Sequence, residues 1–274
     1  MSSSTSLDAQ DQAVRRRALA LERTLVGYFT RRAKRDVADI LRSRKLIAKA
    51  APKIDEELLK ILLKFGLYQT NDAALRAATT TKGLKALIEP TDLLERLRAS
   101  PMKVKIYEDF LARARVSARA IDRTTRELLN EQVRNILAQA AGEDPMPSVG
   151  EIARRISTRA FAKDPNDRVF AFSRSRAELI AHTEIRQAEN IGRQEAYRAA
   201  GVEPKDEIWI AHSDGRSGER HHERMDGARR IKTGPHKDYF KNPTTGVYLR
   251  YPHDPGAPMS ERARCRCGLG FDPL

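Results

Sequence analysis

Residues 167–200, DRVFAFSRSRAELIAHTEIRQAENIGRQEAYRAA, form the last long segment with helical spacing before the character of the chain changes. Its apolar residues recur at intervals near 3.6, the period of a helix with one buried face: Val169, Phe172, Leu179, Ile180, Ile185, Ile191 and Tyr197. Gly201 stands where a C-terminal cap belongs. The last 74 residues, which begin with Gly201, contain 9 of the 15 glycines, 5 of the 6 histidines and the single tryptophan. The sequence therefore predicts a long helix followed by a small region of strands and loops.

Apolar spacing predicts further long helices upstream of this segment. They are expected over 19–46, broken before Pro52; from about Asp55 to just before Gly66; over 103–141 as one helix or a helix pair; and after the capping box of Ser148 and Glu151. Alternating residues predict strands over 207–211, 247–251 and 264–271. The expected fold is mainly α with a small α+β C-terminal part, in which long helices precede a short-stranded sheet.

The predicted domain organisation has three parts. Residues 1–12 are polar and are expected to form a disordered tail, and residues 13–100 a basic helical N-terminal region. Residues 101–274 form the remaining domain, helical over 101–201 and a strand and loop cap over 202–274.

The charge of the chain is strongly basic, with 51 Lys and Arg against 37 Asp and Glu, a net charge of +14. The excess is largest in the first 100 residues, which carry 20 basic and 12 acidic groups. A solvated helix face is one interpretation of such runs, and a sequence-independent double-stranded DNA site is the other. Scarce aromatic residues there argue against a single-strand stacking platform. The predicted phosphate contacts are Arg15, Arg16, Arg17, Arg31, Arg32, Lys34, Arg35, Arg42, Arg44 and Lys45.

Composition also narrows the class of protein. No run approaches the roughly 18–20 apolar residues that cross a bilayer, and residues 1–13 lack the apolar part of a signal peptide. We therefore expect no membrane partner. The two cysteines, Cys265 and Cys267, are too few for a disulfide scaffold, which favours a reducing compartment. Motifs for nucleotide hydrolysis or acyl transfer are missing, so we expect no enzymatic activity and no catalytic residues.

The cysteines raise the question of a metal site. Cys265, Cys267, His222 and His253 supply the thiolate and imidazole ligands that zinc prefers, and His222, Cys265 and Cys267 are the first candidates. The alternative is that the two cysteines point to opposite faces of a terminal strand, so that at most one contributes to a site. We expect structural packing and no cofactor, with zinc as the open alternative.

Other polar residues near the C-terminus also allow two interpretations. Asp214, Arg216, His222 and Asp226 suit either acid/base chemistry or a loop held by an Arg–carboxylate pair, with Asp226 and Gly227 forming a tight turn; we expect the loop. His221, His222, Asn242 and His253 keep open a metal-dependent nuclease. Thr183 and Glu184 are expected to be scaffold residues, with Glu184 paired to Arg186 or Arg193, and Trp209 to anchor the core of the small region.

The order of these features resembles the Mu F-like minor head proteins of tailed phages, the phage head morphogenesis domain family. The matching motifs, in chain order, are Thr183-Glu184 with Asn190, Gly192 and Tyr197 beyond it, Trp209, Asp214-Gly215-Arg216, His222 with Asp226-Gly227, Tyr251-Pro252-His253-Asp254-Pro255, and Cys265-Arg266-Cys267. His182 stands where the family usually has Arg, Ser217 replaces Thr and Met225 replaces Leu. The resemblance covers about 103–271 and does not extend over residues 1 to about 100.

The resemblance implies a structural role in phage head assembly. It implies a minor capsid protein bound to the portal protein, inside the capsid near the portal vertex of the virion, and in the host cytoplasm during assembly. It further implies a role in DNA packaging or delivery, with other capsid or scaffolding proteins as additional partners. Two alternatives remain open: a zinc-dependent nuclease acting on phage or host DNA, and an adaptor that binds protein alone.

Overall fold

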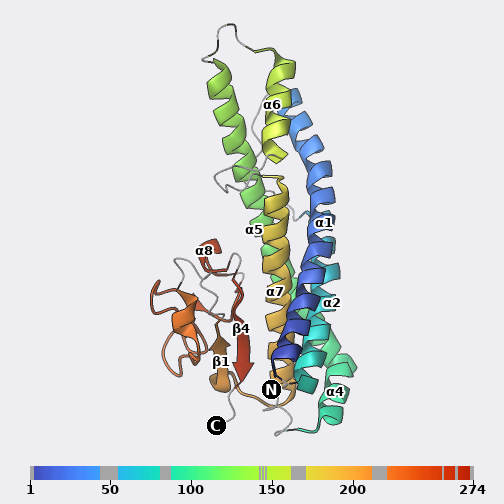
Figure 1. Cartoon of the computed structure of the whole chain (residues 1–274), viewed down its shortest axis with the longest axis vertical. Coiled ribbons are helices and arrows are strands. Elements are labelled where there is room, and N and C mark those ends of the chain that lie inside the picture. The colour runs from blue at the N-terminus through green and yellow to red at the C-terminus, as the bar shows by residue number, and fades with distance from the viewer. Residues whose placement is uncertain are drawn as a thin grey trace. The chain divides into compact units, whose positions relative to one another are not determined.

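The computed structural model describes residues 3–43, 55–80, 88–141, 143, 145, 147–161, 171–211, 221–254, 256–262 and 265–271. Most of these residues are helical (Figure 1), which confirms the predicted fold class. The helices are α1 (Ser3–Ser43), α2 (Glu56–Thr80), α4 (Pro90–Arg98), α5 (Ser100–Ala141), α6 (Val149–Phe161), α7 (Arg174–Ala199) and α8 (Met259–Arg262). The strands are β1 (Glu207–Ile210), β2 (Phe240–Lys241), β3 (Tyr248–Leu249) and β4 (Gly268–Phe271).

The chain divides into two compact units, each built from two separate stretches of sequence. Unit 1 consists of Met1–Ile61 and Ser117–Ala181, and unit 2 of Leu62–Val116 and His182–Leu274. The predicted domains are contiguous instead, with a division near residue 100. Sequence patterns locate helices but not their partners, so they do not reveal that separate stretches share a core.

Local signals set the helix ends that the sequence predicts. The Asp55 carboxylate accepts a hydrogen bond from the Leu58 N–H at 3.0 Å, and the Ser148 hydroxyl accepts one from the Glu151 N–H at 3.2 Å. Both are N-caps. At the C-terminal end of α7, Gly201 has a φ of 83° and the Val202 N–H donates to the Tyr197 carbonyl, as expected of a glycine C-cap.

Two helices differ from their predicted extents, and a third takes one of the two forms predicted for it. Helix α1 begins at Ser3 and so includes most of the expected tail, because no proline or glycine interrupts the chain before Gly27. Helix α2 continues through Gly66 to Thr80 because the Phe110 ring packs directly over that glycine. Residues 103–141 lie in a single helix, α5, rather than a pair.

Unit 1 is held by apolar helix faces and by a buried ion-pair network. Tyr28 and Phe29 of α1 are fully buried, and the Phe29 ring lies edge-on to Phe172 with centroids 6.0 Å apart. Beside them Arg32 is only 2% exposed.

None of the described helices contains a stretch long and apolar enough to cross a bilayer.

Unit 2 contains the strands, which form two small antiparallel sheets. Strand β1 pairs with β4, with Trp209 opposite Leu269, and β2 pairs with β3. The Trp209 side chain is fully buried, edge-on to Phe240 with centroids 5.4 Å apart. This confirms Trp209 as the core anchor. The adjoining part of α7 packs on β4, where Tyr197 donates a hydrogen bond to the Leu269 carbonyl.

Candidate functional site

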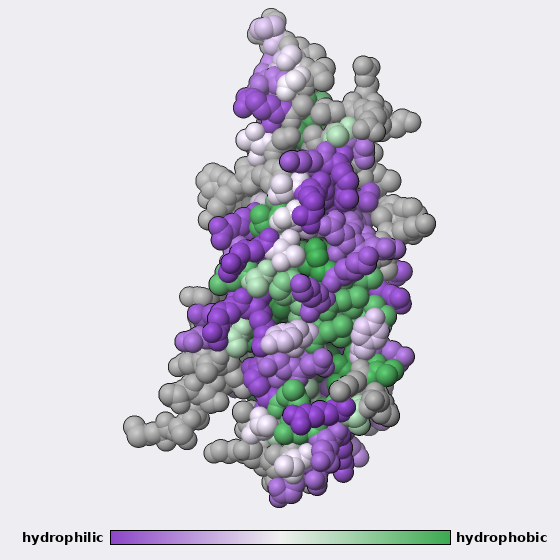
Figure 2. All heavy atoms as spheres, turned by 90° about the vertical axis from the view of Figure 1, so that its right-hand side faces the viewer, coloured by the Kyte–Doolittle hydropathy of each residue, from purple (hydrophilic) through white to green (hydrophobic). Residues whose placement is uncertain are grey.

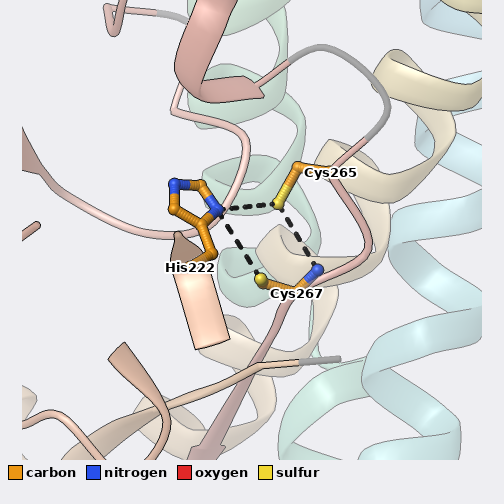
Figure 3. A group of neighbouring side chains, drawn as sticks. All are labelled: His222, Cys265 and Cys267. Carbon is orange, nitrogen blue, oxygen red and sulfur yellow. Dashed lines mark hydrogen bonds between the residues drawn. The ribbon is translucent and has the colours of Figure 1, made fainter. Parts of the chain in front are cut away.

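The imidazole of His222 faces both cysteine thiols in unit 2 (Figure 3). Its Nδ1 lies 3.4 Å from Sγ of Cys265 and 3.7 Å from Sγ of Cys267. His222 comes from the short 3-10 helix His222–Met225, whereas both cysteines lie in the irregular segment before β4. All three side chains are buried. The two thiols therefore do not point to opposite faces of a strand, because strand alternation starts only at Gly268.

A carboxylate determines which nitrogen of His222 faces the sulfurs. The Nε2 atom lies 2.8 Å from the Glu261 carboxylate of α8, and the same oxygen accepts a hydrogen bond from the Asn242 amide at 3.1 Å. Because a carboxylate only accepts hydrogen bonds, the Nε2 atom carries the proton. The lone pair of Nδ1 in neutral His222 is then directed toward Cys265 and Cys267.

The electrostatics of this cluster favour charge separation between sulfur and imidazole. The pKa of Cys267 is lowered to about 5, mainly by its hydrogen bond with the Cys265 thiol and next by His222. Burial opposes this shift. Burial lowers the pKa of His222, but its bonds to Cys267 and Glu261 outweigh burial and the net pKa is raised. The cluster can thus hold a thiolate–imidazolium pair or a soft metal ion with three protein ligands.

Asn190 of α7 fastens the cysteine segment to the helix. Its amide nitrogen donates to the carbonyls of Pro252 and Cys267, both at 3.3 Å, and its carbonyl accepts from the Leu269 N–H at 3.0 Å. The side chain is 1% exposed. One residue thereby satisfies three buried backbone groups from two segments, and it positions Cys267.

Replacing Asn190 with Ala is expected to destabilise unit 2 by about 2 kcal/mol. The change leaves the Leu269 N–H and two carbonyls buried without these partners, and an unsatisfied buried group costs about 1–3 kcal/mol. Urea unfolding followed by Trp209 fluorescence measures the loss, because the only tryptophan of the chain lies in this core. Asn71→Ala, at an exposed position of α2, is the control, and equal stability of the two variants would contradict the assigned role.

Other residues of the resemblance hold loops rather than reactive groups. Asp226 accepts a hydrogen bond from the Ala211 N–H at 2.8 Å, and Gly227 has a φ of 72°, which confirms the predicted tight turn. Pro252 offers its carbonyl to Asn190, and Asp254 accepts from the guanidinium and the N–H of Arg250. Asp214 and Arg216 lie outside the described residues.

Of the two partners expected for Glu184, Arg193 is bonded to other groups, and the pairing with Arg186 stays a prediction. Arg193 pairs with Glu189, four residues before it, and also donates to the Leu269 carbonyl at 3.4 Å. Residues nine apart, such as Glu184 and Arg193, lie on opposite faces of a helix. Thr183 is buried and Glu184 half-buried on the same helix.

The residues considered for a nuclease do not form an open site in the described structure. His222 and Asn242 share Glu261, yet both are buried, at 2% and 0% exposure. His221 pairs with Glu223 at the surface, and His253 is buried at a positive φ of 67°. Because a scissile phosphate must reach catalytic groups, this burial argues against the nuclease interpretation.

The predicted phosphate contacts divide by exposure. Five of them are exposed on α1: Arg15, Arg16, Arg31, Lys34 and Arg35. Arg17 is half-buried, and the exposed Arg31 also pairs with Glu57. Arg32 is a correction: it is buried against Tyr28, Asp36 and Asp122, so it does not face a ligand. The Arg42 side chain, Arg44 and Lys45 lie outside what the structure describes.

Two residues, Arg23 and Glu261, and the contacts made by Asn190 escaped the sequence prediction. Arg23 is exposed on α1, and its distance of seven positions from Arg16 places it on the same helix face, so helical spacing was an available signal. Glu261 and the bridging role of Asn190 had no such signal, since both depend on contacts between distant segments.

These features describe a mainly helical protein whose small strand region contains a buried His/Cys/Cys cluster. Comparison of the chain with models of known protein families, with curated protein sequences and with solved structures finds no match.

Proposed function

We propose that this chain is a non-enzymatic minor head protein of a tailed phage. In this proposal it binds the portal protein inside the capsid, contacts packaged double-stranded DNA without reading its sequence, and acts in head morphogenesis and in DNA packaging or delivery. The portal contact, the capsid location and any contacts with other capsid or scaffolding proteins rest on the resemblance to Mu F-like proteins alone.

The observation that carries the proposal is that residues of the resembling motifs, far apart in sequence, meet in one buried core. Trp209 lies edge-on to His222 with ring centroids 5.3 Å apart, and His222 contacts Cys265 and Cys267. Asn190 joins Pro252 to the same segment. Their roles are structural, which agrees with an assembly protein better than with an enzyme.

Support for DNA contact comes from helix α1. From Arg15 to Arg35 every charged side chain that is exposed is basic, because Glu22 is buried. Arg16, Arg23 and Lys34 share one face, since intervals of 7 and 18 residues are close to whole numbers of turns, and the face extends over roughly 27 Å. Such a row matches the repeated phosphates of a duplex. On the face of the molecule in Figure 2, hydrophilic side chains gather in groups between hydrophobic ones.

The test is binding to a random-sequence duplex at several salt concentrations. Replacing Arg16, Arg23, Lys34 and Arg35 with Gln should weaken binding and make the slope of log K against log salt shallower by about 2–4, since each neutralised phosphate contributes about 0.9. Fluorescence anisotropy of a labelled duplex measures both quantities.

A matched control removes four positive charges elsewhere. Lys64, Arg98, Lys105 and Arg115 are exposed in unit 2, and their joint replacement with Gln lowers the net charge equally. This control should retain the original slope. If both variants lost the same duplex affinity, the weaker binding would be explained by net charge and not by the α1 face. If the duplex bound without salt dependence, DNA contact would be removed from the proposal.

The same samples distinguish the two rival functions. DNA cleavage that requires added metal and disappears in His222→Ala would replace the proposal with the nuclease. Co-sedimentation with the portal protein of the same genome, unchanged by DNA or by the charge variants, would support an adaptor that binds protein alone.

A further inference from the structure

We propose that Nδ1 of His222 and the thiolates of Cys265 and Cys267 bind one zinc ion, which stabilises the strand region of unit 2. The inference concerns a metal site and is independent of the phage assembly function. It rests on the geometry of the three ligand atoms, on the groups around them and on the weak secondary structure of this region.

The distances among the ligand atoms suit a tetrahedral ion. Zn–S bonds near 2.3 Å and Zn–N bonds near 2.0–2.1 Å place N and S about 3.5–3.6 Å apart at a tetrahedral centre. The two Nδ1–Sγ distances of 3.4 and 3.7 Å lie on either side of this value. All three ligand atoms lie within 4.8 Å of one another. An ion can therefore enter with only small shifts of the side chains.

The surroundings of His222 resemble those of a metal ligand. Histidine ligands usually donate their second ring N–H to a carboxylate, which fixes the ring and its tautomer. The Glu261 carboxylate accepts a hydrogen bond from Nε2 of His222 at 2.8 Å, and Asn242 donates to the same carboxylate oxygen. A histidine that served only as packing would not require this buried carboxylate beneath it, because burying a charged group is costly.

The chemistry of the donors selects the ion. Two thiolates and one imidazole favour zinc over magnesium or calcium, which prefer oxygen ligands. Among the described residues, three protein ligands surround the position, which leaves a fourth site for water or another donor. The second cysteine is two residues from the first, so both come from one segment and His222 is the ligand that connects it to another.

The strand region of unit 2 has little secondary structure of its own to hold it together, so a metal ion that links two of its segments would stabilise it. Its described sheets have two strands each, and β2 and β3 are two residues long. Two-stranded sheets of this size are marginal in water. An ion that joins the 3-10 helix His222–Met225 to the segment entering β4 adds binding free energy directly to folding.

Metal content of the full-length protein tests the inference. Protein purified with a reductant and zinc, then dialysed without chelator, should retain one zinc per chain by atomic absorption. Removal of zinc and addition of Co²⁺ should produce the visible bands of a tetrahedral site and sulfur-to-cobalt charge-transfer absorption. A mercurial reagent should release the zinc at two equivalents, because the chain contains two cysteines. These measurements need no variant and so remain informative if cysteine variants fail to fold.

Variants locate the ion. Cys265→Ser with Cys267→Ser should abolish retention, and Glu261→Gln should weaken zinc affinity about 10-fold or more, as loss of a ligand's supporting carboxylate does. His236→Ala changes an exposed histidine of the same unit and should retain one zinc per chain. Wild-type protein without zinc and without the cobalt bands, or a double-serine variant that keeps its zinc, would overturn the inference.

Discussion

Replacing Arg32 with Met is expected to lower the free energy of unfolding by about 3–5 kcal/mol. The Arg32 guanidinium is 2% exposed and contacts the carboxylates of Asp36 and Asp122, of which Asp122 is almost fully buried. It also donates to the Tyr28 hydroxyl at 2.9 Å. Removing the cation takes from Asp36 its guanidinium partner and leaves Asp122 with Arg126 alone, at 3.1 Å. Breaking one side of a buried ion-pair network costs up to this much. Urea unfolding followed by circular dichroism at 222 nm measures the change.

Arg31→Met is the matched control, one residue away on the same helix. Arg31 is 61% exposed and pairs with Glu57 at the surface, where an ion pair contributes about 0–1 kcal/mol. The double variant Arg32→Met with Asp122→Leu should recover part of the loss, because it removes the two most buried charges together while Asp36 and Arg126 stay in place. An Arg32→Met protein of normal stability but weakened DNA affinity would show that Arg32 faces DNA after all.

Replacing Gly192 with Ala is expected to destabilise unit 2 by about 3 kcal/mol. A Cβ at Gly192 of α7 would lie 2.2 Å from the Thr70 carbonyl oxygen and 2.9 Å from the Ala74 nitrogen, both in the backbone of α2. Backbone atoms cannot rotate away, so the helices must separate, and inserting an extra group into a packed core costs about 1–3 kcal/mol or more. Trp209 fluorescence during urea unfolding reports the loss.

Gly150→Ala is the control, for which no loss of stability is expected. Gly150 lies in α6, and a Cβ there meets nothing closer than the Ser148 hydroxyl at 3.8 Å. Alanine stabilises a helix by roughly 0.5–1 kcal/mol relative to glycine, so this variant should be equal to the wild type or slightly more stable. A gain of similar size in Gly192→Ala would mean that α2 and α7 do not touch at that point.

Arg32 and the cysteines show where prediction from the sequence succeeds and where it fails. Helical spacing predicted a helix over much of α1 but not its first residues, and Arg32 looks the same in sequence as its exposed neighbour Arg31. Burial depends on Asp122, ninety positions away, which no local pattern reveals. The two cysteines were expected on opposite faces because a strand was predicted from 264, whereas β4 begins at Gly268.

Local physical chemistry, carried by the sequence itself, determined the elements of this protein. The period of apolar residues predicted the long helices, Ser148 with Glu151 predicted a capping box, and the glycine at 201 predicted the change from helix to strands. These features act over a few residues, so a linear pattern contains them. The excess of basic charge is likewise a property of composition.

Only the tertiary structure decided which residues meet. It brought His222, Cys265 and Cys267 together, set Glu261 behind the imidazole, and made Asn190 a bridge between two segments. Such contacts join residues that are 39 to 79 positions apart. They depend on the packing of whole helices and strands, where geometry rather than local preference determines the neighbours of each side chain.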